Sequence, residues 1–290
     1  MSGSFRNIIQ VSDKSAYEPA TNKTLSIGFF PDGFVFAVLD NDNFRYIALE
    51  EYTIPPNNTS TKESFFLQLE SFIGSHPILS TSFLKACCAY YTPKLVLIPE
   101  DVYDENLKET YFRFCSTIPK GHKIIGDRMH NLNARGLYVV PNDLILFLEK
   151  MFPGCRLKHH SAALIESTLA AQKLEPWQAD LVVHLRNTRF EMLLIDKQQL
   201  IFYQSFSYQI FDDVLYYLFY VLEQHKLDAS TMRMLLMGKM AMDTREYQIL
   251  SSYFQKVAFP ERNDVFQYGE KFDNIPSHFY YNILNLVTCG

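Results

Sequence analysis

The sequence has no surplus of positive charge. Its 290 residues include 27 lysines and arginines against 32 aspartates and glutamates, which gives a formal net charge of −5. A chain with this balance exerts no long-range attraction on nucleic acid phosphates or on an anionic membrane surface. We therefore predict no nucleic acid partner.

Long apolar segments are also lacking. The longest apolar runs, such as VLYYLFYVL at 214–222, are far shorter than the roughly 20 residues needed to span a bilayer. The first ten residues, MSGSFRNIIQ, contain no apolar signal-peptide core. We expect a cytoplasmic protein without membrane insertion.

Paired cysteines at metal-binding spacing are absent. The five cysteines form no CxxC motif, which is the spacing typical of structural zinc sites. The adjacent Cys87 and Cys88 would point to different sides of any regular element. We expect reduced, structural thiols and predict no metal site.

The sequence does contain enough apolar residues for a sizeable core. Hydrophobic residues make up 48% of the chain and charged residues 20%, which is typical of globular proteins. Single cores stop growing at roughly 250 residues, so a chain of this length favours two lobes. Residues 1–23 are polar and irregular, and we expect them to form a flexible tail.

The first half opens with a pattern of strands. Apolar runs at 24–30, 33–40 and 44–52 are separated by turn residues and predict a β-meander. Apolar residues then recur at helical spacing over 62–73. The further elements expected in this half are a helix at about 79–91, a strand at 94–101, a helix at 104–118, an inserted hairpin and helix at about 122–154, and a short strand running into a helix at 155–172.

The second half repeats this order. Strands are expected at 180–186, 189–196 and 199–207, followed by a helix at 212–227, a strand at 232–238, a helix at 243–255, a short strand at 256–260 and a final helix at 277–287. The chain thus contains a β-β-β-α-β-α unit twice. The predicted fold class is a duplicated, ribonuclease H-like α/β fold, with lobes at 24–172 and 179–288 around a cleft.

At this point the chain resembles the actin-like ATPase fold. More narrowly, it resembles an uncharacterised, Bacteroidetes-type family of bacterial proteins that have this fold and no known function. In the ATPases of this fold, the turns of the two meanders hold the phosphates, and a glycine-rich strand end near the C-terminus contacts the adenosine. The resemblance therefore implies three loops to inspect.

The first loop departs from the ATPase pattern. Where the pattern has an acidic residue, an apolar residue, glycine and small hydroxyl residues, this sequence has Ser26, Ile27, Gly28, Phe29 and Phe30. A serine cannot supply the carboxylate that orients magnesium. The two phenylalanines stand where small residues let backbone amides approach a phosphate.

The second loop departs further. Its acidic position is occupied by His184, and Arg186 and Asn187 replace glycines that give a phosphate cradle its close approach and positive φ. Asn187 could itself adopt the left-handed turn conformation, and Arg186 could pair with an anion through its side chain. The hairpin is thus expected to keep the phosphate-loop shape without its chemistry.

The third loop keeps one glycine. Gly238 is followed by Lys239, where small residues are the rule, and the lysine would be either solvated or directed into the cleft. We predict a vestigial nucleotide cleft with no catalytic residue and no metal, partly filled by Phe29 or Phe30 and by Arg186. Its residues would be Gly28, Arg186, Asn187, Gly238 and Lys239.

Two other groups of polar residues suggest a site. His159 and His160, beside Arg156 and Lys158, suggest either an anion site with Arg186 or a hinge lined by solvated basic side chains, and we favour the hinge. The carboxylates at 100–105 suggest either a metal site or helix capping, and we favour capping.

The sequence leaves two functions open. The first is a non-catalytic interaction or scaffold module that binds protein partners and has no cofactor. The alternative is a divergent ATPase or kinase that binds ATP and magnesium weakly through Arg186 and Lys239. A ribonuclease-type nuclease is disfavoured because Ser26 and His184 occupy the places of its metal-binding carboxylates. Homo-oligomerisation is left open.

Overall fold

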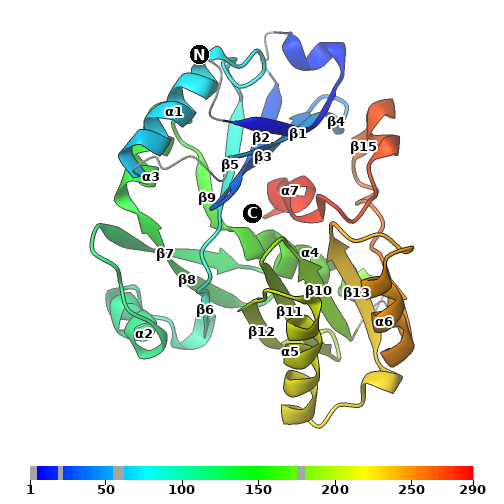
Figure 1. Cartoon of the computed structure of the whole chain (residues 1–290). Helices are drawn as coiled ribbons and strands as arrows, with labels where there is room; N and C mark the ends of the chain where they lie inside the picture. Colours follow the sequence, from blue (N-terminus) through cyan, green and yellow to red (C-terminus); the bar gives the residue numbers. More distant parts are fainter. Residues whose placement is uncertain (1–4, 19–21, 55–61, 175–179, 290) are drawn as a thin grey trace. The chain divides into compact units, whose positions relative to one another are not determined.

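The computed structural model describes residues 5–18, 22–54, 62–174 and 180–289 (Figure 1). The chain divides into two compact units. The first unit consists of Met1–Ala163, Asn263–Ile275 and Asn282–Gly290, and the second of Leu164–Arg262 and Pro276–Tyr281. Residues 1–4 and 19–21 of the expected N-terminal tail, and residues 175–179 at the expected lobe boundary, lie outside the described residues.

The first unit is built on a mixed sheet with the strand order β1-β4-β3-β2-β5-β9. Its strands are β1 (Arg6–Ser12), β2 (Lys23–Phe30), β3 (Gly33–Asp40), β4 (Arg45–Thr53), β5 (Lys85–Tyr90) and β9 (Arg156–His159), and the short β15 (Gln267–Tyr268) also pairs with β4. The meander strands β2, β3 and β4 lie where the apolar runs predict them. They pair antiparallel, whereas β5 and β9 run parallel to β2.

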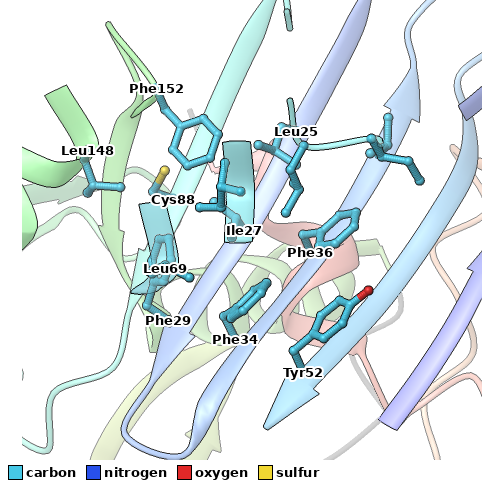
Figure 2. Close-up of a cluster of buried hydrophobic side chains, with 14 of the residues drawn as sticks. Leu25, Ile27, Phe29, Phe34, Phe36, Tyr52, Leu69, Cys88, Leu148 and Phe152 are labelled. Carbon is cyan, nitrogen blue, oxygen red and sulfur yellow. The ribbon is translucent and has the colours of Figure 1, made fainter. Parts of the chain in front are cut away.

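The core of this unit lies between the sheet and two helices. Alternate residues of β2, namely Leu25, Ile27 and Phe29, point to one face and join the buried cluster (Figure 2), as the period of a strand requires. Helices α1 (Lys62–Ser75) and α3 (Asn142–Met151) contribute Leu69 and Leu148 to the same cluster. Each such side chain, once buried, stabilises the fold by about 1.5–3 kcal/mol.

The expectation of a helix at 79–91 is wrong. Residues 85–90, within the helix expected at 79–91, form the strand β5 between β2 and β9. The adjacent Cys87 and Cys88 are both buried because neighbouring side chains of a central strand point to opposite covered faces. Such a short apolar run does not distinguish a strand from a buried helix by periodicity alone.

The N-terminal segment is not irregular throughout. Strand β1 pairs antiparallel with β4, and a 3-10 turn follows at Lys14–Tyr17. The expectation of an unstructured tail over 1–23 is therefore wrong for these residues. Apolar and polar residues hardly alternate in β1, so its sequence does not predict a strand. The strand is evident only from its pairing with β4.

A second, three-stranded sheet is inserted after β5. Its order is β6-β8-β7, with β6 at Val96–Pro99, β7 at His122–Met129 and β8 at Ala134–Pro141. Helix α2 (Lys108–Cys115) packs on it through the buried Phe112. The hairpin at 122–141 is confirmed, but the insertion is longer than expected because β6, predicted as a strand of the main sheet, belongs here.

The second unit contains a five-stranded sheet with the order β12-β11-β10-β13-β14. Its elements are β10 (Leu181–Leu185), β11 (Arg189–Asp196), β12 (Gln199–Ser207), α5 (Phe211–Gln224), β13 (Arg233–Gly238), α6 (Arg245–Tyr253) and β14 (Lys256–Ala258). The α4 helix (His160–Leu174) begins in the first unit and continues in the second. The buried side chains of α5, such as Val214 and Leu218, pack against the strands.

The two sheets confirm the internal repeat. The order β4-β3-β2-β5-β9 matches β12-β11-β10-β13-β14 strand for strand. In both, the first two pairings are antiparallel and the last two are parallel. The chain is a duplicated α/β protein, and the insertion at β6–β8 distinguishes its first copy.

The C-terminal segment is only partly helical. A helix is expected at 277–287, and the chain forms the short helix α7 (Tyr281–Asn285) followed by a 3-10 turn (Leu286–Thr288). In the described part of the chain, no helix has the length and apolar character needed to cross a bilayer.

Candidate functional site

The first predicted loop is the turn between β2 and β3. Ser26 is buried in the middle of β2, between Ala37 of β3 and Cys87 of β5. A Cβ added at Gly28 would lie 3.1 Å from the ring of Phe30, so this ring lies against the side of Gly28 that a side chain would occupy. Phe29 points into the core, where its ring meets that of Phe147 edge to face at 5.9 Å.

The second predicted loop is the tight turn between β10 and β11. The backbone N–H of Arg186 donates to the carbonyl of Arg189 at 2.8 Å and closes the turn. The hydroxyl of Tyr208 donates to the carbonyl of Arg186. Among the described residues, the left-handed positions of this meander are Lys197 and Gln198, so the suggestion of a left-handed Asn187 is wrong.

Beside this turn, a buried ionisable pair joins the two strands. Nδ1 of His184 in β10 lies 2.8 Å from Oε2 of Glu191 in β11, and both side chains are buried. The hydroxyl of Tyr203 in β12 donates to the other carboxylate oxygen at 2.9 Å. The histidine is therefore held by a carboxylate contributed by its own sheet.

The third predicted loop follows β13. Gly238 has a φ of +93°, and a Cβ there would lie 1.9 Å from the carbonyl oxygen of Leu185. Only glycine permits this close approach of β13 to β10. Lys239 is exposed, and its Nζ lies 5.5 Å from the centre of the Tyr280 ring, within the range of a cation–π interaction.

The second unit brings four of the five candidate residues to one end of its sheet. Gly238 is paired with Leu185, and Arg186 and Asn187 follow directly, so the second and third loops are neighbours. Lys239 extends the same end. Gly28 belongs to the other unit. Within the second unit, this end combines two cationic side chains with a single glycine.

Comparison with known proteins identifies the family. A family model described as "Protein of unknown function (DUF3822)" matches residues 12–257. The chain belongs to this family. No protein with a curated description matches the chain.

Similarity to solved structures identifies the fold. A protein from Bacteroides thetaiotaomicron VPI-5482, described as having an actin-like ATPase fold and unknown function, aligns with a TM-score of 0.74 at 18% identity, over 93% of this chain and 96% of that chain. The "PilM-PilN type IV pilus biogenesis complex" contains a chain that aligns with a TM-score of 0.66 at 10% identity, over 91% of this chain and 97% of that chain. This chain has the actin-like ATPase fold.

The histidine pair of this family member does not form a solvated hinge. His159 and His160 are both buried. The backbone N–H of His159 donates to Asp127, and its Nε2 lies 2.9 Å from the carbonyl oxygen of Thr92. Burial raises the pKa of Asp127. These contacts fasten β9 to the inserted sheet, so the expectation of exposed basic side chains is wrong for both histidines.

The acidic segment at 100–105 is structural. Glu100 accepts two hydrogen bonds from Arg135, at 3.0 and 3.2 Å, and Asp104 accepts the backbone N–H of Asn106 at 2.9 Å. Capping is thus confirmed for Asp104. The described residues contain no group of histidine, cysteine or acidic side chains suited to hold a metal ion.

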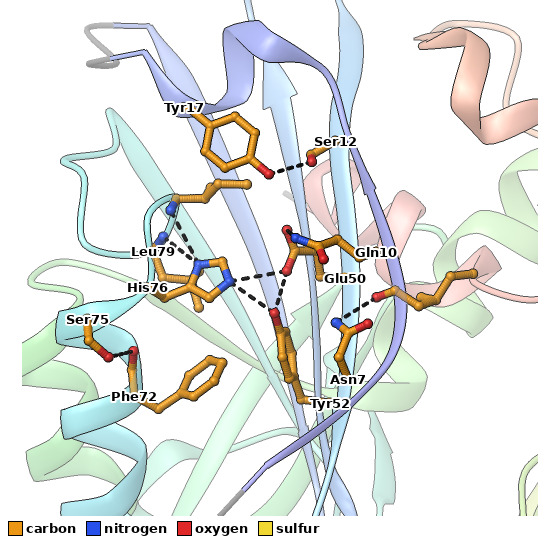
Figure 3. Close-up of polar contacts among 12 residues, drawn as sticks. Asn7, Gln10, Ser12, Tyr17, Glu50, Tyr52, Phe72, Ser75, His76 and Leu79 are labelled. Atoms are coloured by element: carbon orange, nitrogen blue, oxygen red, sulfur yellow. Dashed lines mark hydrogen bonds and ion pairs between the residues drawn. The ribbon is translucent and has the colours of Figure 1, made fainter. Parts of the chain in front are cut away.

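Sequence reasoning missed one buried polar network in the first unit (Figure 3). The fully buried carboxylate of Glu50 accepts the hydroxyl of Tyr52 at 2.6 Å and lies 3.2 Å from Nε2 of His76. Nδ1 of His76 accepts backbone N–H groups of Ile78 and Leu79, so Nε2 carries the proton and donates. The available signal was Glu50 itself, an acidic residue within the apolar run of β4.

Proposed function

We propose that this chain is a non-catalytic protein-interaction or scaffold module that uses an actin-like ATPase fold with a vestigial nucleotide site. The observation that carries the proposal is the buried pair of His184 and Glu191, 2.8 Å apart. His184 stands where the resemblance expects an ATPase carboxylate. An imidazole already held by a neighbouring carboxylate offers a magnesium ion neither the charge nor the oxygen ligands that it requires.

The first loop supports the same proposal. Ser26 is buried and uncharged, and the ring of Phe30 lies against the side of Gly28 that a side chain would occupy. A phosphate cradle needs backbone amides that an anion can approach closely. A phenyl ring against the glycine limits that access.

The partner class is inferred from the fold and from a neighbour. The PilM-PilN complex is described as a pilus biogenesis complex, so a chain with this backbone arrangement occurs in a protein assembly. We propose that this chain likewise acts in the cytoplasm by binding protein partners. Its negative net charge supports partners other than nucleic acid.

A specific observation favours one alternative. Arg186 and Lys239 follow the ends of the neighbouring strands β10 and β13, and two cations at one sheet end suit an anionic ligand. In this alternative, the chain is a divergent ATPase or kinase that binds ATP through side chains. Gly238 does not distinguish the two functions, because its contact with Leu185 requires glycine in either case.

Calorimetry and thermal shift with ATP and magnesium test the proposal. We expect no heat of binding and no change in Tm. A ligand present at 100 times its dissociation constant would stabilise the fold by about 2.7 kcal/mol, a shift of several degrees. If the chain instead bound ATP with micromolar affinity, and if Arg186→Ala and Lys239→Ala each abolished that binding, the divergent ATPase would be the better assignment.

Restoring the motif provides the complementary test. Ser26→Asp alone should bind no nucleotide, because it adds negative charge to a site for an anion. The combined variant Ser26→Asp, Phe29→Thr, His184→Asp and Arg186→Gly should bind ATP weakly at most, since neighbouring changes are not additive. For the scaffold role, the intact chain should capture a protein from its own cytoplasm, and the capture should persist in EDTA.

A further inference from the structure

Strand β12 forms one edge of the sheet of the second unit. It runs over nine residues, Gln199–Ser207, and among the described residues only β11 pairs with it. Its sequence, QLIFYQSFS, contains no charged residue, no proline and no glycine. Proteins usually protect an exposed edge of this length with a lysine, a proline or a covering element, because such an edge readily pairs with another strand.

The internal repeat shows how the equivalent edge is treated in the first unit. There, β4 occupies the position of β12, and its outer edge is paired antiparallel with β1. The outermost strand β1 begins with Arg6, and both edge strands contain a bulge, at Ile8 in β1 and at Ile201 in β12. The fold therefore accommodates an additional antiparallel strand at this position, and the second unit provides none from its described residues.

The backbone of β12 offers hydrogen-bond donors and acceptors to an additional strand. The amide of Tyr208, directly after β12, donates to the carbonyl of Thr188, directly before β11. Because hydrogen-bonding direction alternates along a strand, the backbone groups of Phe206 face β11, whereas those of Ser205 and Ser207 face away from it. Ser207 is exposed, and Ser205 is buried. The carbonyl of Ser205 accepts the side-chain amide of Gln204 at 3.0 Å, in place of a backbone amide from another strand.

An aromatic strip continues from this edge onto α5. The ring of Phe206 stacks on Tyr217 at 4.6 Å, Tyr217 contacts Tyr216 at 5.3 Å, and Tyr216 stacks on Tyr220 at 6.1 Å. Tyr216 is 63% exposed and Tyr220 is 49% exposed. Tyrosine is enriched in protein interfaces because it combines a large apolar ring with a polar hydroxyl.

We propose that β12 is a dimerisation edge, which pairs antiparallel with β12 of a second copy of this chain about a two-fold axis. The two five-stranded sheets would then form one continuous sheet of ten strands. A strand without charge can lie opposite its own copy, whereas a charged strand would bring like charges together. Two-fold symmetry uses the same surface on both copies, and the exposed tyrosines of α5 would flank the joint. This inference does not depend on the proposed scaffold role.

Sedimentation equilibrium of the full chain, with a matched pair of variants, tests the proposal. Ile201 in β12 is 45% exposed, and Ile8 in the other edge strand, β1, is 46% exposed. Ile201→Lys should raise the dimer dissociation constant at least about tenfold, and Ile8→Lys should leave it unchanged. Ser207→Pro removes an outward amide without disturbing the pairing with β11, and should also weaken the dimer. A Tm close to that of the wild type would show that each variant is folded.

Hydrogen exchange locates the contact. The amide of Ser207 should become more protected as protein concentration rises, whereas the amide of Phe206 should be protected at every concentration. A chain that stays monomeric, or a dimer weakened by Ile8→Lys and not by Ile201→Lys, would overturn the proposal. Protection of Ser207 that arises only when an unlike protein is added would assign the edge to that partner and exclude self-pairing.

Discussion

His184 and Glu191 face each other across β10 and β11, with Nδ1 and Oε2 2.8 Å apart and both side chains buried. In an ATPase of this fold, the position of His184 is expected to be acidic. Here the acidic residue is Glu191, seven residues later, and it contacts the histidine. This contact makes the histidine part of the sheet's own hydrogen bonding. Its disruption is therefore expected to affect stability first.

Restoring an acidic residue at this position should destabilise the protein. His184→Asp would place two buried carboxylates side by side, and breaking a buried pair in this way costs about 3–5 kcal/mol. His184→Asn, whose amide can still donate to Glu191, should cost clearly less. Denaturant unfolding followed by circular dichroism measures both, and a wild-type midpoint for His184→Asp would contradict the structural role of the pair.

Gly238 should tolerate no side chain. Gly238→Ala places a Cβ 1.9 Å from the carbonyl oxygen of Leu185 at a φ of +93°, and we expect a loss of at least about 2 kcal/mol. The control is Gly74→Ala in α1, where a Cβ meets no atom within 4 Å. That change should be neutral or stabilise by up to about 1 kcal/mol. Equal unfolding midpoints for the two variants would refute the close approach.

The hydroxyl of Tyr52 should contribute to stability through Glu50. Tyr52→Phe removes the 2.6 Å hydrogen bond to a fully buried carboxylate, and bonds to charged groups contribute about 1.5–3 kcal/mol. Tyr17→Phe removes a 2.7 Å hydrogen bond between the hydroxyls of Ser12 and the exposed Tyr17, and should cost no more than about 1 kcal/mol. Chemical unfolding of both variants decides whether the network around Glu50 stabilises the first unit.

Acidification should weaken the fold through His278. Its ring stacks on Phe259 at 3.7 Å, its Nε2 lies 2.7 Å from the carbonyl oxygen of Met240, and burial lowers its pKa from the usual 6.5. The unfolded chain binds the proton more readily, so this contribution is present above pH 6.5 and is lost as the pH falls below it.

The test compares free energies of unfolding near pH 7.5 and near pH 5.5. The decrease in the free energy of unfolding on acidification should be smaller in His278→Gln than in the wild type. An identical pH dependence in the wild type and in His278→Gln would argue against the assignment.

Much of the fold could be predicted because its signals are local. The meanders at 24–52 and 180–207 are formed by β2–β4 and β10–β12, since alternation over seven to nine residues and turn residues between strands act at short range. The repetition of these units was sufficient to predict the duplicated fold. The candidate site residues remain proposals, because their role depends on ligands and partners.

The apolar patterns alone specify the two meanders and the mixed α/β class, because periodicity selects the secondary structure and the buried face of each element. Tertiary structure alone decided that Lys85–Tyr90 is a central strand, that Arg6–Ser12 is an edge strand, and that His159 is buried. It also paired Glu50 with His76, 26 residues later. Each of these outcomes depends on segments distant in the sequence that meet only in the folded chain, and no local pattern specifies those meetings.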